Sequence, residues 1–158
     1  MKILFTISLL FLFSATNSQD SSKFKMIDSL VSIINTSGLQ VQRDTLVQDY
    51  PEVGLKMTTY LSMIATNTEL LKYVNYVKSD KVEDAVAIEM TASNTFYYLH
   101  NQLIKVEEFV IQPYNDFKAD WYFWDGKSLN DPLPDDKEAP RSKFLLELSR
   151  AMLNQIVK

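Results

Sequence analysis

The middle of the chain alternates between apolar and polar side chains in steps of two, which is typical of β-strands with one buried face. Residues 55–63 show the alternation most clearly, because the odd positions carry Leu55, Met57, Thr59, Leu61 and Met63. Shorter segments with the same character follow at residues 86–91, 95–99, 103–110 and 117–124. The pattern predicts an antiparallel β-meander of five to seven strands.

Two segments near the ends of the sequence have apolar residues at steps of three and four, which predicts amphipathic helices. The first stripe consists of Phe24, Ile27, Leu30, Val31 and Ile34. Capping residues precede this stripe, and Gly38 follows it. The second stripe, within residues 142–157, consists of Phe144, Leu145, Leu148, Met152 and Ile156. Together these elements predict an α+β domain with an N-terminal helix, an antiparallel meander, and a C-terminal helix packed on the sheet.

Residues 69–78 carry signals for both structures. Thr66 and Glu69 imitate the capping box of a helix, whereas the tyrosines and valines between residues 73 and 77 favour a strand. Asn67-Thr68 lies where a hairpin turn would be needed. We therefore predict a strand here, with a helix as the alternative.

Two tight turns are the clearest local signals. Asp125-Gly126 is a preferred pair for a type I′ turn, and His100-Asn101 tolerates the same positive φ angles. Both pairs predict two-residue hairpins. In the first hairpin, Tyr98 should then pair with Leu103, Tyr97 with Ile104, and Phe96 with Lys105.

The two hairpins repeat one unit, which is an aromatic strand, a turn with Asn or Gly, and an aliphatic strand. Residues 97–104 align with residues 122–129 in this way. The unit, with Leu-Ile-Lys-Val after the first turn, resembles the repeated hairpins of small, exported and uncharacterised proteins of the Bacteroidetes type. The resemblance covers residues 59–129. It implies a location in the bacterial envelope and transfers no catalytic residue.

The first 18 residues have the pattern of a secretory signal peptide. Lys2 gives a positive start, residues 3–13 are mostly apolar, and small and polar residues follow up to Ser18. As a helix the apolar run would be about 16 Å long, which is half of the roughly 30 Å of a bilayer core. We therefore expect cleavage after Ser18, export to the periplasm or the medium, a single domain over residues 19–158, and no stable membrane insertion after cleavage.

Composition and charge exclude several functions. With 16 basic and 20 acidic residues the net charge is −4, which disfavours nucleic acid as a partner. The chain has no cysteine and one histidine, His100, which removes thiol catalysis and most metal and triad arrangements. The three glycines lie too far apart for a phosphate-binding loop. We predict no cofactor, no metal and no catalytic residue, and interpret the acidic residues 130–138 as a connector.

The predicted sheet is apolar on both faces. Alternation places Tyr97, Leu99, Ile104 and Val106 on one side, whereas Phe96, Tyr98 and Leu103 share the other side with Lys105 and Glu107. In the second hairpin Tyr122 and Trp124 share a face. Exposed aromatic side chains need a cover. Three covers are possible: the terminal helices, a protein partner or second copy of the chain, and a ligand in a pocket.

These observations favour an exported, non-enzymatic binding or interaction module that uses an aromatic sheet face, with Tyr97, Tyr122 and Trp124 as its candidate binding residues. A competing class is a cone-like α+β domain that binds a small ligand or catalyses a reaction, with Asp120 or Glu107 as a base in a pocket. A third class is a purely structural envelope protein.

Overall fold

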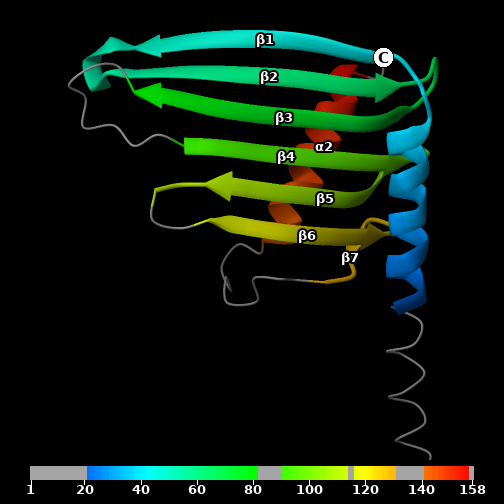
Figure 1. Cartoon of the computed structure of the whole chain (residues 1–158). Coiled ribbons are helices and arrows are strands. Elements are labelled where there is room, and N and C mark those ends of the chain that lie inside the picture. The colour runs from blue at the N-terminus through cyan, green and yellow to red at the C-terminus, as the bar shows by residue number, and fades with distance from the viewer. Residues whose placement is uncertain (1–20, 82–89, 114–115, 131–140, 157–158) are drawn as a thin grey trace, which may run out of the picture. The chain divides into compact units, whose positions relative to one another are not determined.

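A computed structural model describes residues 21–81, 90–113, 116–130 and 141–156 (Figure 1). The chain is an α+β protein with an N-terminal helix, a seven-stranded antiparallel sheet within the described residues, and a C-terminal helix. It divides into two compact units, of which one ends at Thr36 and the other begins at Ser37. The predicted signal peptide at 1–18, residues 86–89 of one predicted strand, and nearly all of the acidic connector lie outside the described residues.

The N-terminal unit contributes a helix over residues 21–36. Ile27, Val31 and Ile34 lie on one side of it at steps of four and three, as the sequence predicts. Thr36 closes the last turn by donating its hydroxyl to the Ser32 carbonyl at 2.9 Å. Gly38 follows in the left-handed region at φ 67°, which is the usual conformation just beyond a helix end.

The second unit is a meander in which every strand pairs with its neighbours in the sequence. The strands are β1 (Val41–Tyr50), β2 (Leu55–Ala65), β3 (Leu70–Lys81), β4 (Met90–Leu99), β5 (Gln102–Ile111), β6 (Phe117–Trp124) and β7 (Lys127–Ser128). A short 3-10 turn, η1 (Pro51–Val53), connects β1 to β2. The C-terminal helix is α2 (Arg141–Ile156).

The sequence did not predict β1, because this strand lies at the end of the sheet and is exposed along nearly its whole length. An edge strand without a buried face needs no apolar alternation, so periodicity gives no signal there. The short β7 was also not predicted.

Residues 70–78 form a strand, so the prediction of strand over helix is confirmed. The Thr66 hydroxyl nevertheless accepts a hydrogen bond from the Glu69 amide at 3.1 Å, which is the contact that a helix cap would make. Here it stabilises the turn between β2 and β3, in which the Thr66 amide also donates to the Glu69 carbonyl at 2.8 Å.

Both predicted two-residue turns are confirmed. His100 and Asn101 have φ angles of 50° and 58°, and Asp125 and Gly126 have φ angles of 50° and 71°. Next to the first turn, Leu99 pairs with Gln102 and Tyr98 with Leu103, as expected.

The predicted pairing farther from this turn is wrong. A β-bulge between Tyr97 and Tyr98 shifts the register, so that Tyr97 pairs with Lys105 and Phe96 with Val106. The extra residue on β5 exchanges the faces of all residues beyond it. Val106 therefore lies with Phe96, and Lys105 lies with Tyr97.

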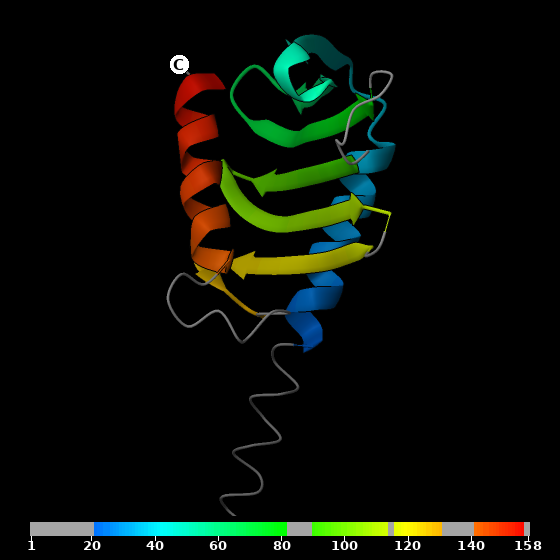
Figure 2. The same cartoon turned by 90° about the vertical axis from the view of Figure 1, so that its left-hand side faces the viewer.

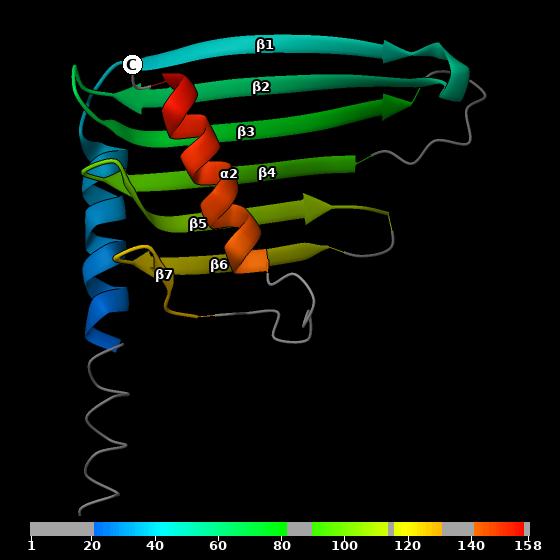
Figure 3. The ribbon, with the colours of Figure 1, turned by 180° about the vertical axis from the view of Figure 1, so that it is seen from behind.

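Helix α2 packs on one face of the sheet, as predicted, and crosses several strands (Figures 2 and 3). The core between them contains Leu70, Phe96, Tyr98, Leu103, Val106, Ala119, Trp121, Phe123 and Leu145. Among the described residues, no helix combines the length and the apolar character needed to cross a membrane.

Candidate functional site

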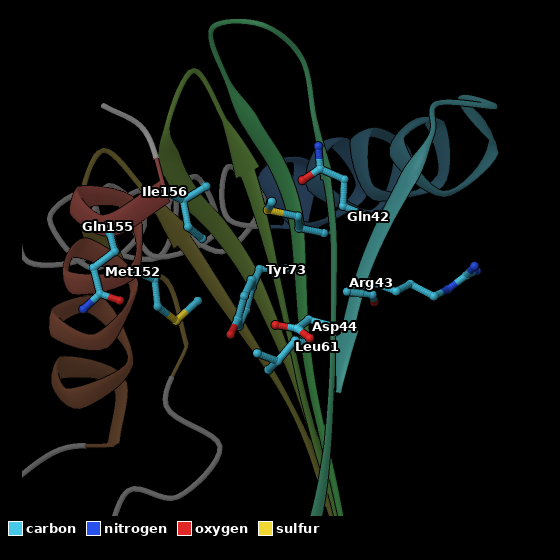
Figure 4. Close-up of a pocket in the computed structure, with 10 residues that line it drawn as sticks. Gln42, Arg43, Asp44, Leu61, Tyr73, Met152, Gln155 and Ile156 are labelled. Carbon is cyan, nitrogen blue, oxygen red and sulfur yellow. The ribbon is translucent and has the colours of Figure 1, made fainter. Parts of the chain in front are cut away.

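A cavity of about 400 Å³ lies between the C-terminal half of α2 and strands β1, β2 and β3 (Figure 4). It opens beside the core, at the end of the sheet where α2 no longer fills the space above the strands. Its lining consists of Gln42, Arg43, Asp44, Leu61, Ser62, Met63, Tyr73, Met152, Gln155 and Ile156.

The edge strand β1 supplies the polar wall of this cavity. Gln42 and Asp44 extend toward α2, whereas Arg43 between them extends away from the cavity (Figure 4). This arrangement follows from strand geometry, because successive side chains lie on opposite faces. Asp44 is held in register with Leu61 of β2, and its Oδ1 accepts a hydrogen bond from the Thr45 amide at 2.7 Å. A second carboxylate oxygen remains as an acceptor.

The apolar wall comes from the sheet and the last turns of α2. Met63, Tyr73, Met152 and Ile156 are partly buried and pack against the core. Two of these four are methionines, whose flexible side chains adapt to differently shaped ligands. The cavity thus continues the core outward and keeps an apolar surface open.

Tyr73 combines an apolar ring with a polar end. Its ring lies 6.4 Å from that of Phe96, centroid to centroid, so packing fixes its position. Burial raises the pKa of its hydroxyl above the ordinary value of 10.0. The phenol therefore stays protonated at neutral pH and can donate a hydrogen bond. The polar groups around the cavity are thus Gln42 and Asp44 on β1, the Tyr73 hydroxyl on β3, and Gln155 on α2.

Tyr97 and Tyr122, two of the sequence-predicted binding residues, lie on the other face in a cluster of charged side chains. The Tyr97 hydroxyl donates to Glu107 Oε2 at 3.0 Å, and Lys72 Nζ lies 5.2 Å from its ring centroid. Burial lowers the pKa of Lys72, and the charge of Glu107 opposes that shift. The Tyr122 ring lies 4.9 Å from Lys105 Nζ. Both tyrosines thus have contacts within the sheet.

Lys105 is the centre of this cluster. Its side chain is only 7% exposed, and Nζ lies 3.1 Å from Glu107 Oε1 and 3.5 Å from Asp120 Oδ2. The two carboxylates lie opposite each other in the register of β5 and β6. The β-bulge places Lys105 on the face of Tyr97 and not, as predicted, on the face of Phe96. Glu107 and Asp120, the candidate bases, are ion-paired partners of this lysine.

Trp124, the third predicted residue, lies two positions beyond Tyr122 on the same face of β6. It is partly buried and borders a separate cavity of about 230 Å³ with Leu99, Gln102 and Ile104. The structure therefore places Tyr97 and Tyr122 in one ionic cluster and Trp124 at a cavity near the hairpin tips. His100 lines the same cavity, and its Nδ1 lies 3.0 Å from Glu69 Oε1.

Sequence reasoning missed the larger cavity because its polar wall is the unpredicted strand β1. The sequence predicts strands that contain Leu61, Met63 and Tyr73 and a helix stripe that contains Met152 and Ile156, so the apolar lining residues look like ordinary core residues in the pattern. Within the described parts of the chain, no group of three or more His, Cys, Asp or Glu residues could hold a metal ion.

No family model, curated protein or solved structure matches the chain. The resemblance to small exported Bacteroidetes proteins stays a prediction from sequence.

Proposed function

We propose that the protein is a non-enzymatic binding module that takes a small amphipathic ligand into the cavity between α2 and the edge of the sheet. The observation that carries the proposal is the composition of the 400 Å³ cavity, which has apolar side chains on both the sheet and α2 and one carboxylate among its lining residues, Asp44 (Figure 4).

The volume and the walls suit a chain-like or ring-like apolar body. Ligand pockets in proteins are mostly apolar, range from about 300 to 1,000 Å³, and place a few polar groups that orient the ligand. Leu61, Met63, Met152 and Ile156 provide the apolar surface. Dispersion contacts and removal of this surface from water would drive binding.

The polar side of the cavity selects the head group of the ligand. The Asp44 carboxylate accepts hydrogen bonds and carries a negative charge, so it favours an ammonium or a hydroxyl group and repels a carboxylate. The neutral Tyr73 phenol and the two glutamine amides accept either kind of head group. We therefore propose a ligand with an apolar body and a cationic or hydroxyl end.

Three probes with the same alkyl chain test this proposal, namely decylamine, decanol and decanoate. The chain has six methionines, and labelling their methyl groups with carbon-13 gives separate NMR signals for Met63 and Met152. We expect decylamine and decanol to shift both signals saturably, and decanoate to bind at least tenfold more weakly. Asp44→Asn should remove the preference for decylamine over decanoate.

A variant that fills the cavity provides the control. Ile156→Trp should abolish the shifts with all three probes, whereas Phe144→Trp, which changes an exposed position of the same helix, should leave them unchanged. Absence of saturable shifts at Met63 and Met152 with every probe, or shifts that persist in Ile156→Trp, would overturn the proposal.

Trp124 supports a second candidate function, in which a protein partner or a second copy covers the aromatic face. The supporting observation is that Trp124 is only partly buried and borders the 230 Å³ cavity, whereas Tyr97 and Tyr122 are held by Glu107, Lys72 and Lys105. If this face mediates association, Trp124→Ala should weaken it by at least tenfold, since a tryptophan is a typical interface anchor. An unchanged association constant would contradict it.

We also infer from the sequence that residues 1–18 direct export and are then removed, so that the module acts in the periplasm or outside the cell. Mass spectrometry of the protein isolated from its native cells tests this inference. The expected N-terminal residue is Gln19, and an intact Met1 on the major species would contradict the inference.

A further inference from the structure

Strand β1 ends the sheet, and no strand in the described parts of the chain pairs with its outer edge. Residues 42–49 are all exposed, including Leu46 at 52% and Val47 at 49%. A long edge strand presents a row of backbone amide and carbonyl groups to which another strand can be added. The side chains along β1 decide which strand fits.

The sequence of β1 is complementary to itself. When two copies of Val41–Tyr50 run antiparallel with Leu46 opposite Leu46, Arg43 of each copy lies opposite Asp49 of the other. The other opposed pairs are Thr45 with Val47, Asp44 with Gln48, and Gln42 with Tyr50. The pairing therefore contains two ion pairs, one apolar contact on the symmetry axis, and no opposed like charges.

The neighbouring registers that keep the same faces together lose this complementarity. A shift in one direction places Leu46 opposite Asp44 and Arg43 opposite Val47. A shift in the other direction places Leu46 opposite Gln48 and moves Arg43 beyond the end of the facing strand. The charge pattern of β1 thus selects one register.

We propose that the outer edge of β1 is a homodimer interface, formed by antiparallel pairing of two copies about a two-fold axis through Leu46. The pairing joins the two sheets into one continuous sheet with both α2 helices on the same face. The pairing occupies the outer edge of β1 in both copies. A third chain therefore cannot add at this edge, and the assembly stops at two chains.

The dimer also completes the wall of the cavity. Gln42 and Asp44 line the cavity, and directly opposed residues on paired strands share a face. Tyr50 and Gln48 of the second copy would therefore lie beside Gln42 and Asp44. The dimer proposal does not depend on the proposed ligand, because it is tested by molecular mass and cross-linking in the absence of any probe.

Charge reversal tests the two ion pairs. Sedimentation of the purified protein should show a dimer, and Arg43→Asp or Asp49→Arg should each raise the dimer dissociation constant at least tenfold. The double variant Arg43→Asp/Asp49→Arg restores opposite charges and should restore the dimer. Lys143→Glu reverses an exposed charge on α2 and is the control. Circular dichroism confirms that each variant is folded.

Cross-linking tests the register itself, and the absence of cysteine makes the background clean. In the proposed register the two Leu46 Cα atoms are about 4.5 to 5.5 Å apart, within the range that a disulfide spans. Leu46→Cys should therefore form a disulfide dimer under mild oxidation. Gln48→Cys lies on the same face, but its counterpart is four residues away along the strand, about 13 Å, so it should not cross-link.

A dimer that responds to both single reversals and recovers in the double variant, together with cross-linking at Leu46 alone, supports the proposal. A monomer at high concentration overturns it. A dimer that survives the reversals, or that only Trp124→Ala dissociates, overturns it in favour of another surface. Failure of the double variant to recover, or equal cross-linking at Gln48, overturns the register.

Discussion

Arg141 Nη2 lies 2.6 Å from Glu108 Oε1, and this contact joins the first residue of α2 to the middle of β5. Arg141 Nε also approaches the two carboxylate oxygens at 3.3 and 3.4 Å. The Glu108 side chain is only 4% exposed, whereas that of Arg141 is 40% exposed. The arginine therefore compensates a buried carboxylate at the point where the helix starts to cover the sheet.

Arg141→Ala should destabilise the protein by about 2 kcal/mol, because it leaves the buried Glu108 carboxylate without its cation. This value is below that of fully buried pairs, since the exposed side of Arg141 is screened by water. Urea unfolding followed by circular dichroism measures the change. Lys143→Ala removes an exposed charge two residues farther along α2, and an equal effect of the two substitutions would contradict the prediction.

The Asn101 side chain connects two hairpin turns. Its Oδ1 accepts a hydrogen bond from the Leu70 amide at 3.0 Å, and its Nδ2 donates to the Thr68 carbonyl at 3.2 Å. Asn101→Gly preserves the positive φ but loses both hydrogen bonds, so it should cost about 1 to 2 kcal/mol in unfolding free energy. Asp125→Gly makes the same backbone change in the second turn and should cost less. Equal losses would show that the connection between the turns does not contribute.

The local signals of the sequence predicted most of the sheet. His100-Asn101 and Asp125-Gly126 specified two hairpins through their φ preferences, and the alternation of residues 55–63 specified β2. The register beyond Tyr98 could not be predicted. Ile104 is the extra residue of the bulge on β5, and no glycine or other local signal in the sequence marks it. The effect of the bulge is large, since it moves Lys105 from the face of Phe96 to the face of Tyr97, where Lys105 pairs with Glu107 and Asp120.

The candidate site was less predictable than the fold. The cavity combines β1, which has no apolar period, with Tyr73 and Met152, which look like ordinary core residues in their own segments. Only the three-dimensional path of the chain shows that α2 leaves part of their surface open. Tyr97 and Tyr122, two of the predicted binding residues, have intramolecular partners that depend on the shifted register.

The two tryptophans should respond differently to truncation. Trp121 is fully buried in the core under α2, so Trp121→Ala should cost about 3 to 5 kcal/mol in unfolding free energy. Trp124 lies on the opposite face and is partly exposed, so Trp124→Ala should cost less than half as much. Thermal and urea unfolding of the two variants measure the difference. Equal losses would assign Trp124 to the core and remove it as a candidate anchor.

Alkaline unfolding should depend on Tyr98, which is fully buried against α2. Burial raises the pKa of Tyr98 to about 12. In the unfolded chain a tyrosine has a pKa of about 10, so the folded state binds this proton more tightly. The resulting stabilisation is complete below about pH 10 and is lost as the pH rises toward 12. It amounts to about 2 to 3 kcal/mol.

Urea unfolding of the protein between pH 8 and 11.5 should therefore show that the free energy of unfolding declines as the pH rises, and that this decline is smaller in Tyr98→Phe. Tyr60→Phe, at an exposed position, should retain the full decline, and parallel curves for the original chain and Tyr98→Phe would refute the assignment.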